Sequence, residues 1–78
     1  MMEKALKNAA VGERLFIKNL ACAPSIRARL QDIGLLEGTM VECVGIAPLG
    51  DPAAFLIRGA VIALRGKDTK DIIAEEAD

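Results

Sequence analysis

Three segments decide the fold of this chain: Arg29-Leu30-Gln31-Asp32-Ile33-Gly34-Leu35-Leu36-Glu37-Gly38, Pro48-Leu49-Gly50-Asp51-Pro52 and Arg58-Gly59-Ala60-Val61-Ile62-Ala63-Leu64-Arg65. Their glycines stand where a helix end, a loop and a tight hairpin would each require positive φ, which glycine adopts without strain. Reactive side chains are nearly absent from the same segments. The pattern therefore predicts a small barrel that is bound by a partner and catalyses nothing.

The first segment closes a short helix, which we expect over about residues 25–33. Ile26, Leu30 and Ile33 recur at spacings of four and three, so they form one apolar stripe along a helix. Pro24 suits a first helical turn, and Gly34 suits the left-handed position just past a helix end. The pattern predicts a helix whose apolar side faces the core.

Two arginines lie on this helix. Arg27 and Arg29 flank the apolar stripe on opposite sides, because successive helical residues are rotated by about 100°. Arg29 is expected to pair with Asp32 one turn later, which would contribute about a few tenths of a kcal/mol. The other interpretation is that one of the arginines meets a carboxylate or a phosphate of a binding partner.

Short aliphatic runs elsewhere in the chain indicate strands. We expect strands over residues 14–20, 40–47, 54–57, 60–64 and 72–74, with residues 58–59 as a two-residue hairpin turn. Residues 1–10 fit either a helical turn or an extended segment, and residues 66–71 fit a turn that includes one helical turn capped by Asp68. About five short antiparallel strands and one helix predict a mainly β fold, a partly open barrel that forms one domain over residues 1–78.

Composition excludes several classes of protein. A net charge of −1 and a pI near 5.4 argue against a nucleic-acid binder. The longest apolar runs, residues 53–57 and 60–64, are far shorter than the ~20 residues of a membrane-spanning helix, and no signal peptide is evident. Two cysteines fit a reducing cytoplasmic location. Acidic residues are concentrated in positions 68–78, which we interpret as a solvated tail or, alternatively, as an electrostatic docking element.

Metal binding and catalysis find little support in the residue types. The chain has no histidine, and Cys22 and Cys43 lack the spacing of a metal motif. Glu42 and Cys43 would point to opposite faces of a strand, so they would not converge on one ion. We therefore expect no required cofactor and no enzymatic activity, with ferrous iron as the transition metal ion to test.

The spacing of these residues resembles that of the FeoA family. The resemblance covers nearly the whole chain and rests on Leu6, Gly12-Glu13, Arg29-Leu30-x-x-Ile33-Gly34-Leu35-x-x-Gly38-x-x-Val41, Gly50-Asp51-Pro52, Arg58-Gly59-x-x-Ile62-Ala63-Leu64-Arg65 and Ile72. It implies an SH3-like barrel and a role in ferrous iron transport, with the cytoplasmic part of a FeoB-type membrane transporter, which contains a G-protein domain, as the partner. It also implies the fold of the C-terminal domain of DtxR-type iron-dependent repressors.

Two functional hypotheses follow from the residues and the resemblance together. The first is a non-catalytic accessory protein that docks on the FeoB-type transporter. We expect its contact surface to combine the helix and its exit with the restrained loop at residues 48–52, through Arg27, Arg29, Leu35, Leu36, Leu49 and Asp51. Leu35 can pack back onto the helix after Gly34, and only one of Leu35 and Leu36 is needed to close it, so the other is a candidate for the surface. The alternative interpretation places both leucines in the core.

The second hypothesis is a metal-linked regulatory module that resembles the SH3-like domain of the repressors and binds a transition metal ion. A third interpretation is self-association through the edges of the open barrel.

Overall fold

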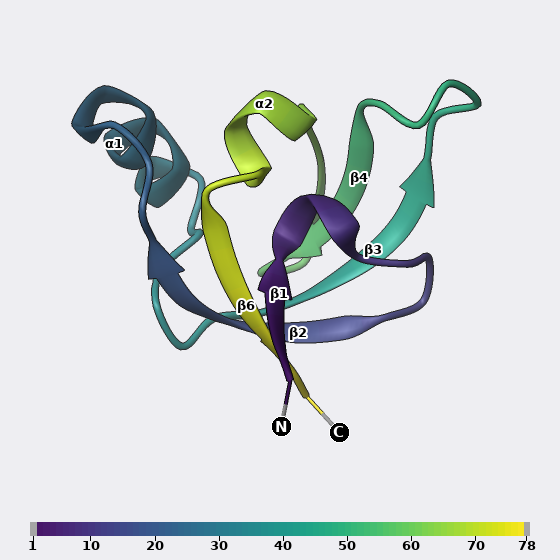
Figure 1. The fold of residues 1–78 in the computed structure, drawn as a ribbon, viewed down its shortest axis with the longest axis horizontal. Coiled ribbons are helices and arrows are strands. Elements are labelled where there is room, and N and C mark those ends of the chain that lie inside the picture. Colours follow the sequence, from purple (N-terminus) through teal and green to yellow (C-terminus); the bar gives the residue numbers. More distant parts are fainter. Residues whose placement is uncertain (1, 78) are drawn as a thin grey trace.

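The computed structural model describes residues 2–77, which form one six-stranded antiparallel sheet in the order β1-β6-β2-β3-β4-β5 (Figure 1). The strands are β1 (Glu3–Ala5), β2 (Arg14–Leu20), β3 (Met40–Ile46), β4 (Ala53–Ile57), β5 (Ala60–Leu64) and β6 (Ile72–Glu76). The helical segments are η1 (Leu6–Asn8), α1 (Pro24–Asp32) and α2 (Gly66–Thr69). The sheet curls around the core, and β1 and β5 are its two edges, so the predicted mainly β, partly open architecture is confirmed.

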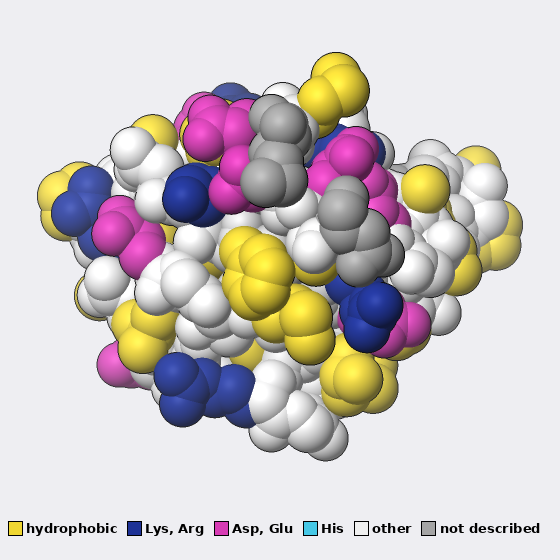
Figure 2. Space-filling view, turned by 90° about the horizontal axis from the view of Figure 1, so that it is seen from below, with side chains coloured by type: hydrophobic (Ala, Val, Ile, Leu, Met, Phe, Trp, Pro, Cys, Tyr) yellow, Lys and Arg dark blue, Asp and Glu magenta, His cyan; other side chains and the backbone are white. Residues whose placement is uncertain are grey.

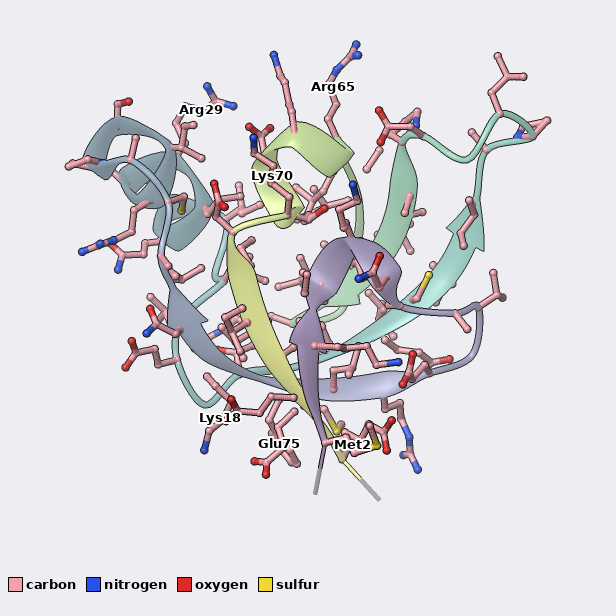
Figure 3. All side chains as sticks on the ribbon, in the orientation of Figure 1. Met2, Lys18, Arg29, Arg65, Lys70 and Glu75 are labelled. Atoms are coloured by element: carbon pink, nitrogen blue, oxygen red, sulfur yellow. The ribbon has the colours of Figure 1, made fainter. Side chains whose placement is uncertain are left out.

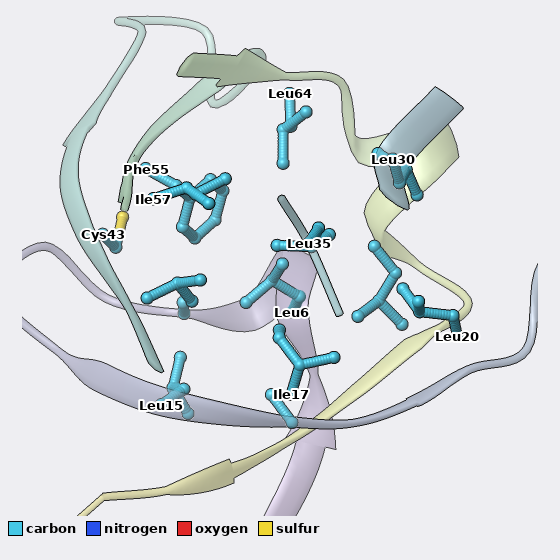
Figure 4. Close-up of a cluster of buried hydrophobic side chains, with 14 of the residues drawn as sticks. Leu6, Leu15, Ile17, Leu20, Leu30, Leu35, Cys43, Phe55, Ile57 and Leu64 are labelled. Carbon is cyan, nitrogen blue, oxygen red and sulfur yellow. The ribbon is translucent and has the colours of Figure 1, made fainter. Parts of the chain in front are cut away.

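Side chains that alternate between the inner and outer faces of the strands form the core inside the curved sheet. On β2, Leu15 and Ile17 are completely buried, whereas Phe16 between them points outward. On β3, Cys43 is buried in the same way, as the prediction of an ordinary core cysteine requires. Figure 4 shows these side chains in one cluster with others from β4, β5 and the helical segments, which include Leu6, Leu30, Leu35, Phe55, Ile57 and Leu64.

Helix α1 confirms the predicted stripe in part. Leu30 is buried, but Ile26 and Ile33 are only partly covered by the core. Gly34 has a φ of +96° just past the helix end, and the backbone N–H of Leu35 donates to the carbonyl of Leu30 at 3.0 Å. This reversal turns Leu35 back into the core, where it is completely buried.

The hairpin between β4 and β5 also confirms its prediction. Arg58 and Gly59 have φ values of +51° and +85°, and Ile57 pairs with Ala60 across the turn. Positive φ at both central residues matches the twist of a two-residue hairpin. The sixth strand, β1, comes from residues 1–10, where the sequence allowed either a helical turn or an extended segment and the structure has both.

Two expectations about the last part of the chain are wrong. The acidic residues before position 77 do not form a free tail, because β6 lies between β1 and β2 and Glu75 pairs with Lys18 at 3.5 Å. Tertiary strand pairing overrides the polar composition here. Asp68 does not cap a helical turn either: it lies within α2, is buried, and Arg65 occupies the residue before the helix. Asp78 lies outside the described residues.

Candidate docking surface

Two open hollows run along α2 and meet at Leu64 and Lys67. The first has a volume of about 480 Å³, separates α1 from β5 and α2, and is lined by Arg29, Leu30, Asp32, Ile33, Ala63, Leu64, Arg65, Lys67 and Asp68. The second has a volume of about 310 Å³, separates α2 from the β3–β4 loop, and is lined by Lys7, Leu49, Gly50, Asp51, Ala53, Leu64, Gly66, Lys67 and Thr69. We call the two together the α2 groove. Figure 3 shows Arg29, Arg65 and Lys70 at this end of the molecule.

The β3–β4 loop is held against α2 by Asp51. Its carboxylate oxygen Oδ1 accepts a hydrogen bond from the backbone N–H of Gly66 at 2.6 Å, so a residue fifteen positions away satisfies a free donor of the first turn of α2. Within the loop, the N–H of Gly50 donates to the carbonyl of Ala47 at 2.7 Å. Leu49 projects from this restrained loop and is 97% exposed. The structure therefore presents an apolar side chain on a fixed support.

Arg29 connects α1 to α2 across the groove. Its Nη2 lies 4.0 Å from Oδ2 of Asp68, so the ion pair observed for Arg29 in the described residues is with Asp68. The expected pair with Asp32 is therefore wrong, because the tertiary fold brings α2 alongside the helix. The Asp68 side chain is only 11% exposed, whereas that of Arg29 is 73% exposed. The guanidinium thus compensates a nearly buried carboxylate and still reaches solvent.

The other residues predicted for the contact surface lie elsewhere. Arg27 donates from Nε to the carbonyl of Leu20 at 3.1 Å and lines a separate hollow with Glu37, on the side of α1 opposite Arg29 as its helical position predicts. Leu36 is 38% exposed and lines neither hollow of the α2 groove.

The prediction that Leu35 belongs to the contact surface is wrong. Leu35 is completely buried and closes the helix, so it belongs to the core and is not available to a partner. The structure thus brings together only Arg29, Leu49 and Asp51 of the predicted set. Sequence reasoning missed Arg65 and Lys67, and the signal that could have found them is their position around the short helical turn at residues 66–71.

The α2 groove carries a basic excess at its rim. Arg65, Lys67 and Lys7 are exposed there, whereas the carboxylates of Asp51 and Asp68 already interact within the protein. Asp32 is the remaining exposed carboxylate among the lining residues. Because complementary charge directs association and selects partners, this rim favours an acidic surface or segment.

The outer face of the sheet carries a second apolar surface. Phe16 pairs with Met40, and Leu56 pairs with Val61, with Glu42 between the two pairs. These four hydrophobic side chains are 37–65% exposed. Figure 2 views the molecule from the side of β2 and β3 and shows hydrophobic side chains gathered near the centre, with charged side chains around them. This face is distinct from the strand edges β1 and β5, to which the self-association hypothesis refers.

The described residues contain no group of three or more His, Cys, Asp or Glu side chains placed to hold a metal ion. Cys22 and Cys43 are free thiols buried in the core, and Glu42 lies on the opposite face of β3 from Cys43, as the strand alternation predicts. Metal-linked regulation stays a prediction, to be tested by titration with ferrous, manganese or zinc ions under reducing conditions.

Among the described residues, the carboxylate with a clearly perturbed pKa is that of Glu13, which lies outside the α2 groove. The pKa of Glu13 is lowered chiefly by its hydrogen bond with Lys4, whose Nζ lies 2.7 Å from Oε2, and further by the backbone N–H of Ala10, which donates to Oε1 at 3.0 Å. This cluster joins β1 to the start of β2. Its placement indicates a structural role.

Comparison with known proteins supports the fold and the resemblance. The FeoA protein from Chlorobium tepidum is 28% identical, with 95% of this chain and 70% of that chain covered and a TM-score of 0.89. Iron(II) transport protein A from Clostridium thermocellum is 30% identical, with 94% and 45% covered and a TM-score of 0.90. IdeR from T. acidophilum is 14% identical, with 97% and 35% covered and a TM-score of 0.85, a likeness that shows the fold alone.

These likenesses confirm the predicted SH3-like fold. In the part of the chain that the structure describes, no helix has the length and apolar character to cross a bilayer. A family model for the FeoA domain matches residues 4–76, and this chain therefore belongs to the FeoA family.

Proposed function

We propose that this protein is a non-catalytic accessory component of ferrous iron uptake that docks on the cytoplasmic part of a FeoB-type transporter. Membership of the FeoA family supports involvement in ferrous iron uptake. The observation that supports docking is Leu49, which is 97% exposed on a loop that Asp51 fastens to α2 through a 2.6 Å hydrogen bond. An apolar side chain held so far out of the protein serves no purpose in its own core.

The energetics favour Leu49 as an anchor for a partner. Complete burial of a leucine side chain contributes about 1.5–3 kcal/mol. Restraint of the loop before binding reduces the conformational entropy that association would otherwise cost. The basic rim beside the loop, Arg65 and Lys67, would add electrostatic selection for an acidic partner surface. The α2 groove and Leu49 therefore form one docking surface with an apolar anchor and a charged border.

The test is calorimetric titration of the protein with the purified cytoplasmic domain of a FeoB-type transporter, with and without guanine nucleotide. Leu49→Glu is expected to leave the fold intact and to weaken binding by about tenfold or more, which corresponds to 1.4 kcal/mol. Val11→Glu is the matched control, because Val11 is 60% exposed and lines neither hollow of the α2 groove. Equal affinities of the two variants and the wild type would refute Leu49 as the anchor. Absence of binding by the wild type in every nucleotide state would refute docking itself.

A further inference from the structure

Within residues 2–77, strand β5 is an edge of the sheet and its outward hydrogen-bonding groups have no partner strand. It pairs there with β4 alone, in a register that aligns Ile57 with Ala60 and Phe55 with Ile62. Because a two-residue hairpin is closed by a hydrogen-bonded pair, the backbone N–H and C=O groups of Val61 and Ala63 point away from β4. In the described residues, no backbone hydrogen bond joins Val61 or Ala63 to another segment.

The composition of β5 makes this edge unusual. Native proteins protect free edges with charged residues, proline or very short strands. The opposite edge, β1, follows that rule, since it has three residues and two of them are charged. β5 has five residues, Ala-Val-Ile-Ala-Leu, without a charge or a proline, and Val61 is 65% exposed. Such a strand is suited to pair with an added strand.

Charged residues bracket β5 at both ends. Arg58 precedes the strand and Arg65 follows it, and both are exposed. The stem of Arg58 lies against Gly34 at the end of α1, because a Cβ at Gly34 would come within 2.8 Å of its Cδ. Antiparallel pairing of β5 with the β5 of a second copy would place Arg58 of each chain near Arg65 of the other. Like charges in that arrangement are destabilising, whereas acidic residues on an incoming segment would be stabilised at both ends.

Space for an incoming segment lies beside the edge. The hollow of about 480 Å³ separates Ala63 and Leu64 from Leu30 on α1 and from Ile33, the residue that follows the helix. Apolar side chains thus line part of it, and its charged lining residues are the exposed cations Arg29, Arg65 and Lys67 and the carboxylates Asp32 and Asp68, of which Asp68 is paired with Arg29. An extended chain in this position would form main-chain hydrogen bonds with β5 and direct alternate side chains toward α1, the usual arrangement of strand addition.

We propose that the free edge of β5 binds an extended acidic segment of the partner as an additional strand, between β5 and α1. This inference rests on the proposed function, because it takes the segment to belong to the cytoplasmic part of the FeoB-type transporter. Leu49 then supplies an apolar anchor at one end of the docking surface, and β5 supplies sequence-tolerant main-chain pairing at the other.

The experiment is an amide chemical-shift titration of the labelled protein with the purified cytoplasmic domain of the transporter, together with affinities of three variants. Ala63→Pro removes an outward N–H, which an edge strand tolerates because that group bonds to no other strand. Arg65→Glu reverses one bracketing charge, and Arg65→Lys is its matched control. We expect saturable shifts at Val61 and Ala63, about tenfold weaker binding for Ala63→Pro and Arg65→Glu, and less than about threefold weakening for Arg65→Lys. Should Ala63→Pro fail to fold, the shifts and the Arg65 pair decide alone.

The possible outcomes distinguish a failure of strand addition at β5 from a failure of the proposed docking function. Strand addition would be overturned if the wild type binds, the folded Ala63→Pro and Arg65→Glu variants bind with unchanged affinity, and the shifts are confined to other segments. That result would leave the proposed function standing. Absence of binding by the wild type would overturn the proposed function and this inference with it. Concentration-dependent shifts of Val61 and Ala63 without the partner, with a dimer by sedimentation, would identify a second copy as the occupant and also overturn the proposal.

Discussion

The adjacent leucines after α1 give the sharpest test of the structure. Leu35 is completely buried, whereas Leu36 is 38% exposed. Replacement of a fully buried leucine by alanine removes about 2–5 kcal/mol, because the lost transfer free energy is joined by the energy of the cavity left behind. We expect about 3–4 kcal/mol for Leu35→Ala and less than about 1 kcal/mol for Leu36→Ala.

The expected loss is large for a domain of this size. At about 0.05–0.15 kcal/mol per residue, a chain of 78 residues has a free energy of unfolding of about 4–12 kcal/mol. Each kcal/mol lowers the Tm of such a domain by about 4–8 °C, so Leu35→Ala should lower it by at least about 12 °C. Leu35→Met, which nearly conserves volume, should cost less than about 1.5 kcal/mol and provides a variant that folds.

The assay is urea unfolding followed by far-UV circular dichroism, because the chain contains no tryptophan or tyrosine for fluorescence. Free energies of unfolding at equal m-values give the comparison between variants. The reasoning is refuted if Leu36→Ala is as destabilising as Leu35→Ala, since the helix end would then direct the other leucine into the core.

Two further predictions concern glycine and charge. Gly34→Ala and Gly38→Ala should each lower the free energy of unfolding by about 1–2 kcal/mol, because both residues have positive φ. Gly34→Ala should carry an additional cost, because a Cβ there would meet Arg58 whereas Gly38 faces open space, and this cost should disappear in an Arg58→Ala background. A double-mutant cycle of unfolding free energies that shows no coupling between positions 34 and 58 would contradict this. The lowered pKa of Glu13 beside Lys4 stabilises the fold fully above the unfolded pKa of about 4.5, and that stabilisation is lost as pH falls through the lower folded pKa. The difference in unfolding free energy between the wild type and Glu13→Gln should therefore shrink on acidification below pH 4.5, and a constant difference across that range would contradict the assignment.

The sequence was sufficient for features that depend on neighbours along the chain. The strand at residues 14–20 and the hairpin turn at Arg58-Gly59 follow from alternation and from positive φ, which are local properties. The helix end is likewise local, since Gly34 determines where the chain reverses. The same reasoning let Leu35 pack back onto the helix but left open whether Leu36 is also buried, because that depends on where the core lies relative to the reversal.

The candidate docking surface could not be predicted in this way, because contacts between distant segments produce it. Helical spacing assigned Arg29 to Asp32, but the partner observed is Asp68, which is brought near only when α2 packs at the end of β5. The hydrogen bond from Gly66 to Asp51 likewise joins segments fifteen residues apart. Sequence reasoning found single members of the α2 groove and missed how they are connected.

The two edges of the sheet show why this surface matters for function. Both edges expose backbone groups, yet the chain protects them differently: β1 carries charges within the strand, whereas β5 carries them only beyond its ends, at Arg58 and Arg65. Charges within a strand discourage every incoming strand, but charges at the ends discourage only those of the same sign. A sheet that needed only solubility would protect both edges in the first way. Like charges at the two ends of β5 would disfavour self-pairing and favour an acidic strand, which is the property that our docking proposal requires.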